Sequence, residues 1–238
     1  MDVKNSIQLS SLLDMKDPGK IIGEVKKIFC YHYPSKFFHQ VKSNFHLAKK
    51  IFDGKFRGYK KCNTYYHDFK HTMDTLLATA RIIDGYNIKQ KLLPVKYIVN
   101  LLIASLYHDV GYIQEEWDNE GTGAKFTKYH IQRSIDFLLR HQNKLQFNKD
   151  DIEMINRLIR CTGFAGDLLL IHFNTEEEKI AGAILGTADL LGQMSDRTYL
   201  EKLLFLYYEF KEAEILGYNT EFDIIRKTID FYILTKKK

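Results

Sequence analysis

The sequence predicts an all-α fold, built as a single compact bundle of several helices. Apolar residues recur along most of the chain with the 3.6-residue period of an amphipathic helix, and the alternating Val/Thr runs of half-buried strands are rare. Only three prolines interrupt the 238 residues. With 45% hydrophobic and 27% charged residues, the chain has the composition of a globular protein that buries a sizeable core.

The helical periodicity is broken at positions that favour turns. Asp53-Gly54, Asp84-Gly85 and Gly217 are turn signals, and Pro94 opens a helix where its missing amide hydrogen costs nothing. The expected helices cover residues 21–31, 37–52, 67–84, 94–107, 126–142, 149–161, 175–193, 196–215 and 221–235.

One domain is expected over residues 21–238, after a loose segment over residues 1–20, because no repeat or linker divides the chain.

The three cysteines include no C-x-x-C pair, which argues against a disulfide framework or zinc ribbon and favours a reducing, cytoplasmic setting. The chain shows no signal-peptide pattern and no apolar run of about 18 residues, so neither secretion nor membrane spanning is expected. The formal net charge of +5 is scattered, which disfavours a nucleic-acid partner.

Two segments carry adjacent metal-ligand side chains at helical positions. In YHDFKHTMD, the spacing of His67, His71 and Asp74 places all three on one face of a helix. In LLIASLYHDVGY, an apolar helix ends at His108-Asp109. A buried imidazole and carboxylate are costly to desolvate unless they are paired or bound to a cation. Both segments are therefore candidates for a metal site.

Two further segments add one candidate ligand each. Asp189 lies in the small and apolar stretch GTADLLGQM, and His130 lies in KYHIQRS. Imidazoles and carboxylates together suit Zn, Fe, Mn or Co and are poor ligands for calcium. Such a metal lowers the pKa of water and withdraws charge from a phosphoryl oxygen, so the chemistry expected of the site is hydrolysis.

The order H…HD…D along these helices resembles the HD superfamily of metal-dependent phosphohydrolases. Within it, the first segment is similar to the motif Y-H-N-x-x-H-A-x-D-V of cyclic-nucleotide phosphodiesterases. The matching positions are Tyr66, His67, His71 and Asp74.

The resemblance implies an all-α HD-type bundle whose metal-site core spans about residues 60–195. It implies that His67 is the general acid, which protonates the leaving oxygen, and that Asp109 serves both as metal ligand and in catalysis. The metal ligands implied by the resemblance are His71, His108, Asp109 and Asp189.

Some positions depart from the phosphodiesterase motif. Asp68, Thr72 and Thr75 replace its Asn, Ala and Val. Tyr112 stands where those enzymes carry a further histidine that helps to hold a second metal. His130 is an alternative ligand for a second divalent ion such as Mg. Otherwise His130 is expected either to contact the metal ligands or to be a packing residue.

Several other residues have two possible roles each. Asp74 either orients the His71 ring or is a solvated helix residue. Lys125 and Gln193 either contact a substrate phosphate or are a surface lysine and a packing glutamine. The aromatic stretch over residues 200–210 is interpreted as core or as a dimer contact rather than as a base-stacking platform.

The expected function is hydrolysis of a small-molecule phosphoester, with a nucleotide, including a 3′,5′-cyclic one, as the favoured substrate. One alternative is a nucleotidase or deoxynucleotide phosphohydrolase, because the HD core serves many phosphate substrates. Another is a non-catalytic HD module that binds a metal or nucleotide and signals through a partner. The presence of His67 favours the enzyme, since a binding module needs no proton donor. A homo-oligomer is compatible with the sequence.

Overall fold

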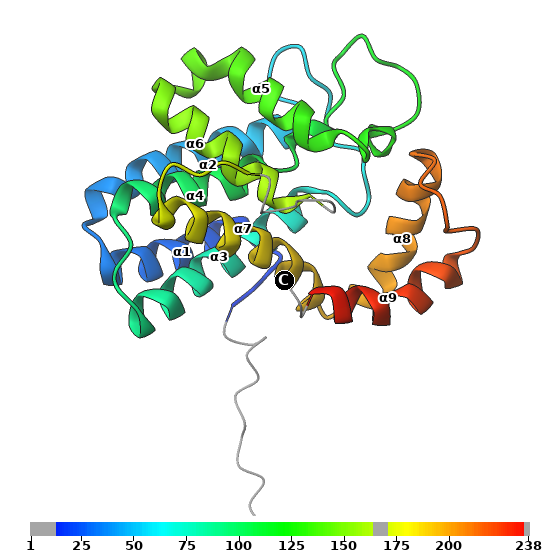
Figure 1. Ribbon diagram of the computed structural model, residues 1–238. Helices are drawn as coiled ribbons and strands as arrows, with labels where there is room; N and C mark the ends of the chain where they lie inside the picture. Colours follow the sequence, from blue (N-terminus) through cyan, green and yellow to red (C-terminus); the bar gives the residue numbers. More distant parts are fainter. Residues whose placement is uncertain (1–12, 164–170, 236–238) are drawn as a thin grey trace, which may run out of the picture.

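The computed structural model describes residues 13–163 and 171–235, and helices joined by loops build this part of the chain (Figure 1). Its regular structure consists of α-helices and short 3-10 turns, and its β-structure is limited to an isolated bridge between Tyr59 and Glu115. The all-α prediction is confirmed.

Every predicted helix has a counterpart, with ends that differ by a few residues. The predicted break at Asp84-Gly85 does not end its helix, because one glycine costs a helix only about 1 kcal/mol. The helices are α1 (Pro18–His32), α2 (Phe38–Phe52), α3 (Phe69–Lys89), α4 (Val95–Tyr107), α5 (His130–Leu145), α6 (Lys149–Ile159), α7 (Glu176–Met194), α8 (Tyr199–Glu212) and α9 (Glu221–Thr235).

The start of α3 differs from the prediction in a way that matters for the site. Asp68 has an extended backbone, and its side chain accepts a hydrogen bond from the His71 amide at 2.9 Å, which makes Asp68 the N-cap. His67 therefore precedes the helix. The prediction that His67, His71 and Asp74 share one helix face is wrong for His67.

The predicted loose segment over residues 1–20 lies mostly outside the described part of the chain. Asp17 caps α1 by accepting hydrogen bonds from two backbone amides at 2.8 and 3.3 Å. The helix begins at Pro18, a first-turn position that tolerates proline. The first helix therefore starts earlier than the predicted residue 21.

Helices α3 and α4 occupy the centre of the bundle. Helix α3 packs against α1, α4 and α7, and α4 also packs against α2, α6 and α7. Buried side chains from α1 through α7 form one continuous core. Helices α8 and α9 lie at one side of the molecule (Figure 1). They pack around a smaller cluster of Tyr66, Leu203, Leu206, Tyr207, Phe210 and Ile224.

The turn after α4 brings the His108-Asp109 dipeptide against the start of α5. The Gly111 amide donates to Ser134 Oγ at 2.9 Å, and Ser134 Oγ donates to the His108 carbonyl at 2.6 Å. A Cβ atom on Gly111 would lie 1.9 Å from the His130 carbonyl oxygen. Only glycine permits this close approach of two backbones.

We expect Gly111→Ala to lower the free energy of unfolding by about 1–3 kcal/mol or more, because the two backbones must separate to admit the methyl group. Gly85→Ala is the matched control, since Gly85 lies within α3 with open space around it. That change should raise stability by up to about 1 kcal/mol. Urea unfolding followed by circular dichroism measures both, and equal effects would contradict the close-approach argument.

Candidate metal centre

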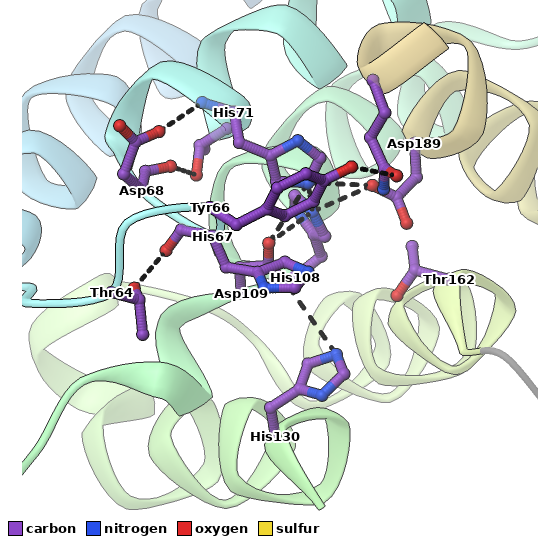
Figure 2. A network of polar contacts seen from close by, with 12 residues as sticks. Thr64, Tyr66, His67, Asp68, His71, His108, Asp109, His130, Thr162 and Asp189 are labelled. Atoms are coloured by element: carbon purple, nitrogen blue, oxygen red, sulfur yellow. Dashed lines mark hydrogen bonds and ion pairs between the residues drawn. The ribbon is translucent and has the colours of Figure 1, made fainter. Parts of the chain in front are cut away.

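Four buried side chains from three helices converge at one point of the bundle. His71 lies near the start of α3, and His108 ends α4 with Asp109 directly after it. Asp189 lies in α7, on the opposite side of the cluster (Figure 2). None of the four is more than 7% exposed.

The candidate ligand atoms of His71, His108 and Asp109 all lie within 4.8 Å of one another, as ligands of one ion would, and Asp189 Oδ1 lies close to both imidazoles. His71 Nε2 lies 3.4 Å from His108 Nε2, and it lies 3.3 Å from Asp109 Oδ2 and 3.0 Å from Asp189 Oδ1. His108 Nε2 lies 3.2 Å from Asp109 Oδ2 and 3.5 Å from Asp189 Oδ1. Ligands about 2.1 Å from a shared cation are separated by roughly 3.0 Å at right angles and roughly 3.4 Å at tetrahedral angles.

The hydrogen bonding of the cluster also fits a cation. Among the described residues, Asp109 Oδ2 and Asp189 Oδ1 are buried without a hydrogen-bond partner, although each lies within 3.5 Å of both imidazole nitrogens. His108 Nδ1 donates to the Ser105 carbonyl at 2.9 Å, so a neutral His108 turns the lone pair of Nε2 towards the cluster. Buried carboxylate oxygens without partners are costly, and a transition-metal ion would remove that cost.

Charge pairing holds the same four side chains together when no cation is bound. Burial opposes charge on His71, but Asp109 and Asp189 outweigh it and raise the pKa of His71 to about 9. The pKa of His108 is also raised against the effect of burial, by the same two carboxylates. Despite burial, the two imidazoles hold the pKa values of Asp109 and Asp189 well below the usual range. Metal binding would therefore replace protons on the histidines and release them.

His67 lies beside the cluster and is held by a carboxylate from a distant helix. Its Nδ1 is 2.6 Å from Glu209 Oε2 in α8. Glu209 Oε1 accepts a hydrogen bond from the Tyr66 amide at 2.7 Å, which fixes the backbone just before His67. A histidine whose Nδ1 binds a carboxylate has a set ring orientation and keeps Nε2 free for proton exchange.

Tyr112 contacts two imidazoles. Its ring stacks on His67 with a centroid distance of 4.4 Å and on His130 with a centroid distance of 4.5 Å. The interplanar angles are 9° and 20°. Tyr112 thus sets the planes of both neighbouring rings.

His130 faces the outer oxygen of Asp109. Its Nε2 lies 3.7 Å from Asp109 Oδ1, while its Nδ1 contacts the Thr127 carbonyl at 2.8 Å (Figure 2). Burial lowers the pKa of His130, which favours the neutral form that binds metals. Asp109 therefore has one oxygen in the main cluster and the other near His130, so His130 and this outer oxygen are the side-chain atoms that would hold a second ion.

Asp74 has a lysine partner. Lys70 Nζ lies 2.6 Å from Asp74 Oδ2 and 2.7 Å from Asp196 Oδ2, so the lysine ties α3 to the segment after α7. Asp74 Oδ1 is buried without a hydrogen-bond partner among the described residues. The interpretation of Asp74 as a merely solvated helix residue is wrong, because its side chain is buried in this contact.

The two predicted phosphate contacts have partners within the protein. Lys125 Nζ lies 2.6 Å from Asp118 Oδ1 and donates to the Glu120 carbonyl at 2.6 Å, so its charge is already paired in its own loop. Gln193 Oε1 accepts a hydrogen bond from Tyr66 OH at 2.8 Å. This contact places Gln193 against the residue before His67, and Lys125 is left out of the candidate site.

Sequence reasoning missed Glu209. The stretch over residues 200–210 was expected to be core or a dimer contact, and most of its inward side chains do form the small cluster with α9. Glu209 is only 3% exposed. A single acid among aromatic residues on a buried helix face was the available signal, because such an acid needs a partner.

Comparison with known proteins places the chain in a family. Across the described residues, no helix has both the length and the apolar character to cross a membrane. No curated protein and no solved structure matches the chain significantly. Residues 115–237, more than half of the chain, match the Npun_R2479-like family, and the protein is therefore a member of the Npun_R2479-like family.

Proposed function

We propose that the protein is a metal-dependent phosphohydrolase that cleaves a phosphoester, with a nucleotide as the favoured substrate. The observation that carries this proposal is the convergence of His71, His108, Asp109 and Asp189, with two carboxylate oxygens that lack hydrogen-bond partners. The order of these residues also resembles the HD superfamily. A bound divalent metal would supply a water of lowered pKa and would withdraw charge from a phosphoryl oxygen.

The surroundings of His67 favour catalysis over simple binding. His67 lies next to the cluster, and its ring contacts those of His71 and Tyr112 at centroid distances of 5.6 and 4.4 Å. Glu209 binds Nδ1, which leaves Nε2 to give a proton to the leaving oxygen. A module that only binds a metal or nucleotide has no use for a proton donor supported in this way.

A substrate screen tests the proposal directly. The metal-loaded protein should hydrolyse at least one compound among cyclic nucleotides, nucleoside monophosphates and deoxynucleoside triphosphates. The class that is turned over distinguishes a phosphodiesterase from a nucleotidase or deoxynucleotide phosphohydrolase. Metal binding without turnover of any phosphoester would favour the non-catalytic module.

A first test of the proposed function concerns the metal. We expect the purified protein to hold a transition-metal ion and Asp109→Ala to lose it, because the remaining ligands compete poorly with water. Asp136→Ala, at an exposed aspartate of α5, is the control and should keep the metal. Elemental analysis measures the metal content of both variants. Wild-type metal content in both Asp109→Ala and His108→Ala would show that the site is assigned wrongly.

A second prediction concerns the number of metal ions. Because His130 Nε2 faces the outer oxygen of Asp109, we expect His130→Ala to lose part of the bound metal and to lower the rate more than tenfold. His141→Ala is the control, since His141 lies on the same helix and contacts Tyr59 instead. Unchanged metal content with a loss below about tenfold, roughly 1.4 kcal/mol in the barrier, would make His130 a packing residue.

A third prediction separates the general acid from the ligands. His67→Ala should keep its metal and lose on the order of 10² to 10⁴ in rate on an ester with an alkoxide leaving group, which needs a proton in the transition state. The loss should be much smaller on a p-nitrophenyl ester, whose leaving group departs without a proton. Glu209→Gln should lower the rate less than His67→Ala does, with the same dependence on the leaving group.

The matched comparison is His71→Ala, which should fail on both substrates because the cation is lost. Parallel rate measurements and metal analysis on the three variants decide the roles. Equal losses on both substrates for His67→Ala, with metal intact, would leave His67 as a residue that positions the substrate.

A further inference from the structure

The outer side of α9 is apolar although nothing in the described structure covers it. Phe222, Ile225, Ile229 and Ile233 follow one another at spacings of three or four residues, so they form one stripe along the helix. Their exposed fractions lie between 38% and 68%. Ile224, in contrast, is buried in the small cluster with α8. The helix therefore has one apolar side that is used within the chain and another that is exposed.

Helix α8 continues this exposed surface. Leu200, Leu204 and Tyr208 are spaced four residues apart on α8, and each is more than a third exposed. Tyr208 OH donates a hydrogen bond to Glu221 Oε1 at 2.7 Å, so the two stripes adjoin where α8 ends and α9 begins. These seven apolar residues of α8 and α9 are called the outer stripe below.

The outer stripe is large for a monomer. From the exposed fractions, it leaves about 650 Å² of surface open, if a fully exposed large apolar residue contributes roughly 180 Å². The largest apolar patch on a typical monomer covers about 300–600 Å², and a standard interface buries about 800 Å² per partner. The outer stripe together with its polar rim therefore has the size that a stable dimer needs.

We propose that the outer stripe pairs with the same surface of a second copy of this chain, with the two α9 helices antiparallel about a twofold axis. A surface that binds its own copy must be self-complementary. Glu221 and Asp223 lie in the first turn of α9. Antiparallel pairing keeps the two acidic first turns apart, whereas parallel pairing places these like charges together.

Two features of the chain support a second copy as the occupant. The family match extends to residue 237, so α9 is part of the region shared by the Npun_R2479-like family. In addition, α8 and α9 rest on a separate small cluster at the side of the bundle (Figure 1). Dimerisation would bury their second apolar side in a four-helix arrangement. This proposal does not depend on the proposed phosphohydrolase activity.

Sedimentation equilibrium of the full chain tests the interface. Wild-type protein should be dimeric at micromolar concentration. Ile229→Glu should weaken dimerisation by at least about tenfold, because it buries a charge in the apolar contact. Ile88→Glu is the control, since Ile88 is a similarly exposed isoleucine in the last turn of α3. A monomeric wild type, or a dimer that Ile229→Glu leaves unchanged, would overturn the proposal.

Cysteine crosslinking tests the antiparallel arrangement. In a background with Cys30→Ser, which removes an exposed thiol, chains with Phe222→Cys and chains with Ile233→Cys are oxidised separately and as a mixture. Antiparallel pairing brings position 222 of one copy near position 233 of the other. Only the mixture should form a crosslinked dimer. Crosslinking of either variant alone would show parallel pairing, and no crosslink in any sample would overturn the proposed arrangement.

Discussion

Burial of four ionisable side chains where α3, α4 and α7 meet is the constraint on which the rest of the structure depends. Two carboxylates and two imidazoles lie within a few ångströms of one another and are almost inaccessible to solvent. Such a cluster is tolerated only if its charges balance or a cation is bound. The three helices must therefore approach closely, because each has to place its ionisable side chain in this cluster.

Small residues permit this approach. A Cβ atom on Gly192 of α7 would lie 3.1 Å from the backbone at Asp74 and Thr75 of α3, so the glycine lets the two helices pack tightly beside Asp189. Gly111 has the same effect after α4, where it lets the His108-Asp109 turn rest on the start of α5. Helix α8 completes the arrangement, because Glu209 binds His67 and Glu212 accepts hydrogen bonds from Thr122 at 2.5 and 2.6 Å.

The parts of this structure that depend on local chemistry could be predicted from the sequence. Helical periodicity indicated every helix. The resemblance to the HD pattern implied His71, His108, Asp109 and Asp189 as ligands, and the fold brings these side chains together. The position of His67 could not be predicted from periodicity, because Asp68 caps α3 one residue later. Glu209 and His67 are 142 residues apart, so their contact is a product of tertiary packing. The pairing of Lys125 with Asp118 could not be predicted for a related reason, since it depends on the fold of the intervening loop.

The candidate site joins residues from two halves of the chain, and the family match covers only the second half. The match to the Npun_R2479-like family begins at residue 115, so it includes His130, Asp189 and Glu209. The residues from His67 to Asp109 precede it. Neither half holds a complete set of ligands, because the first lacks Asp189 and the second lacks both clustered imidazoles. Family membership therefore carries no function by itself, and the proposed chemistry needs the side chains that come together where α7 and α8 meet the ends of α3 and α4.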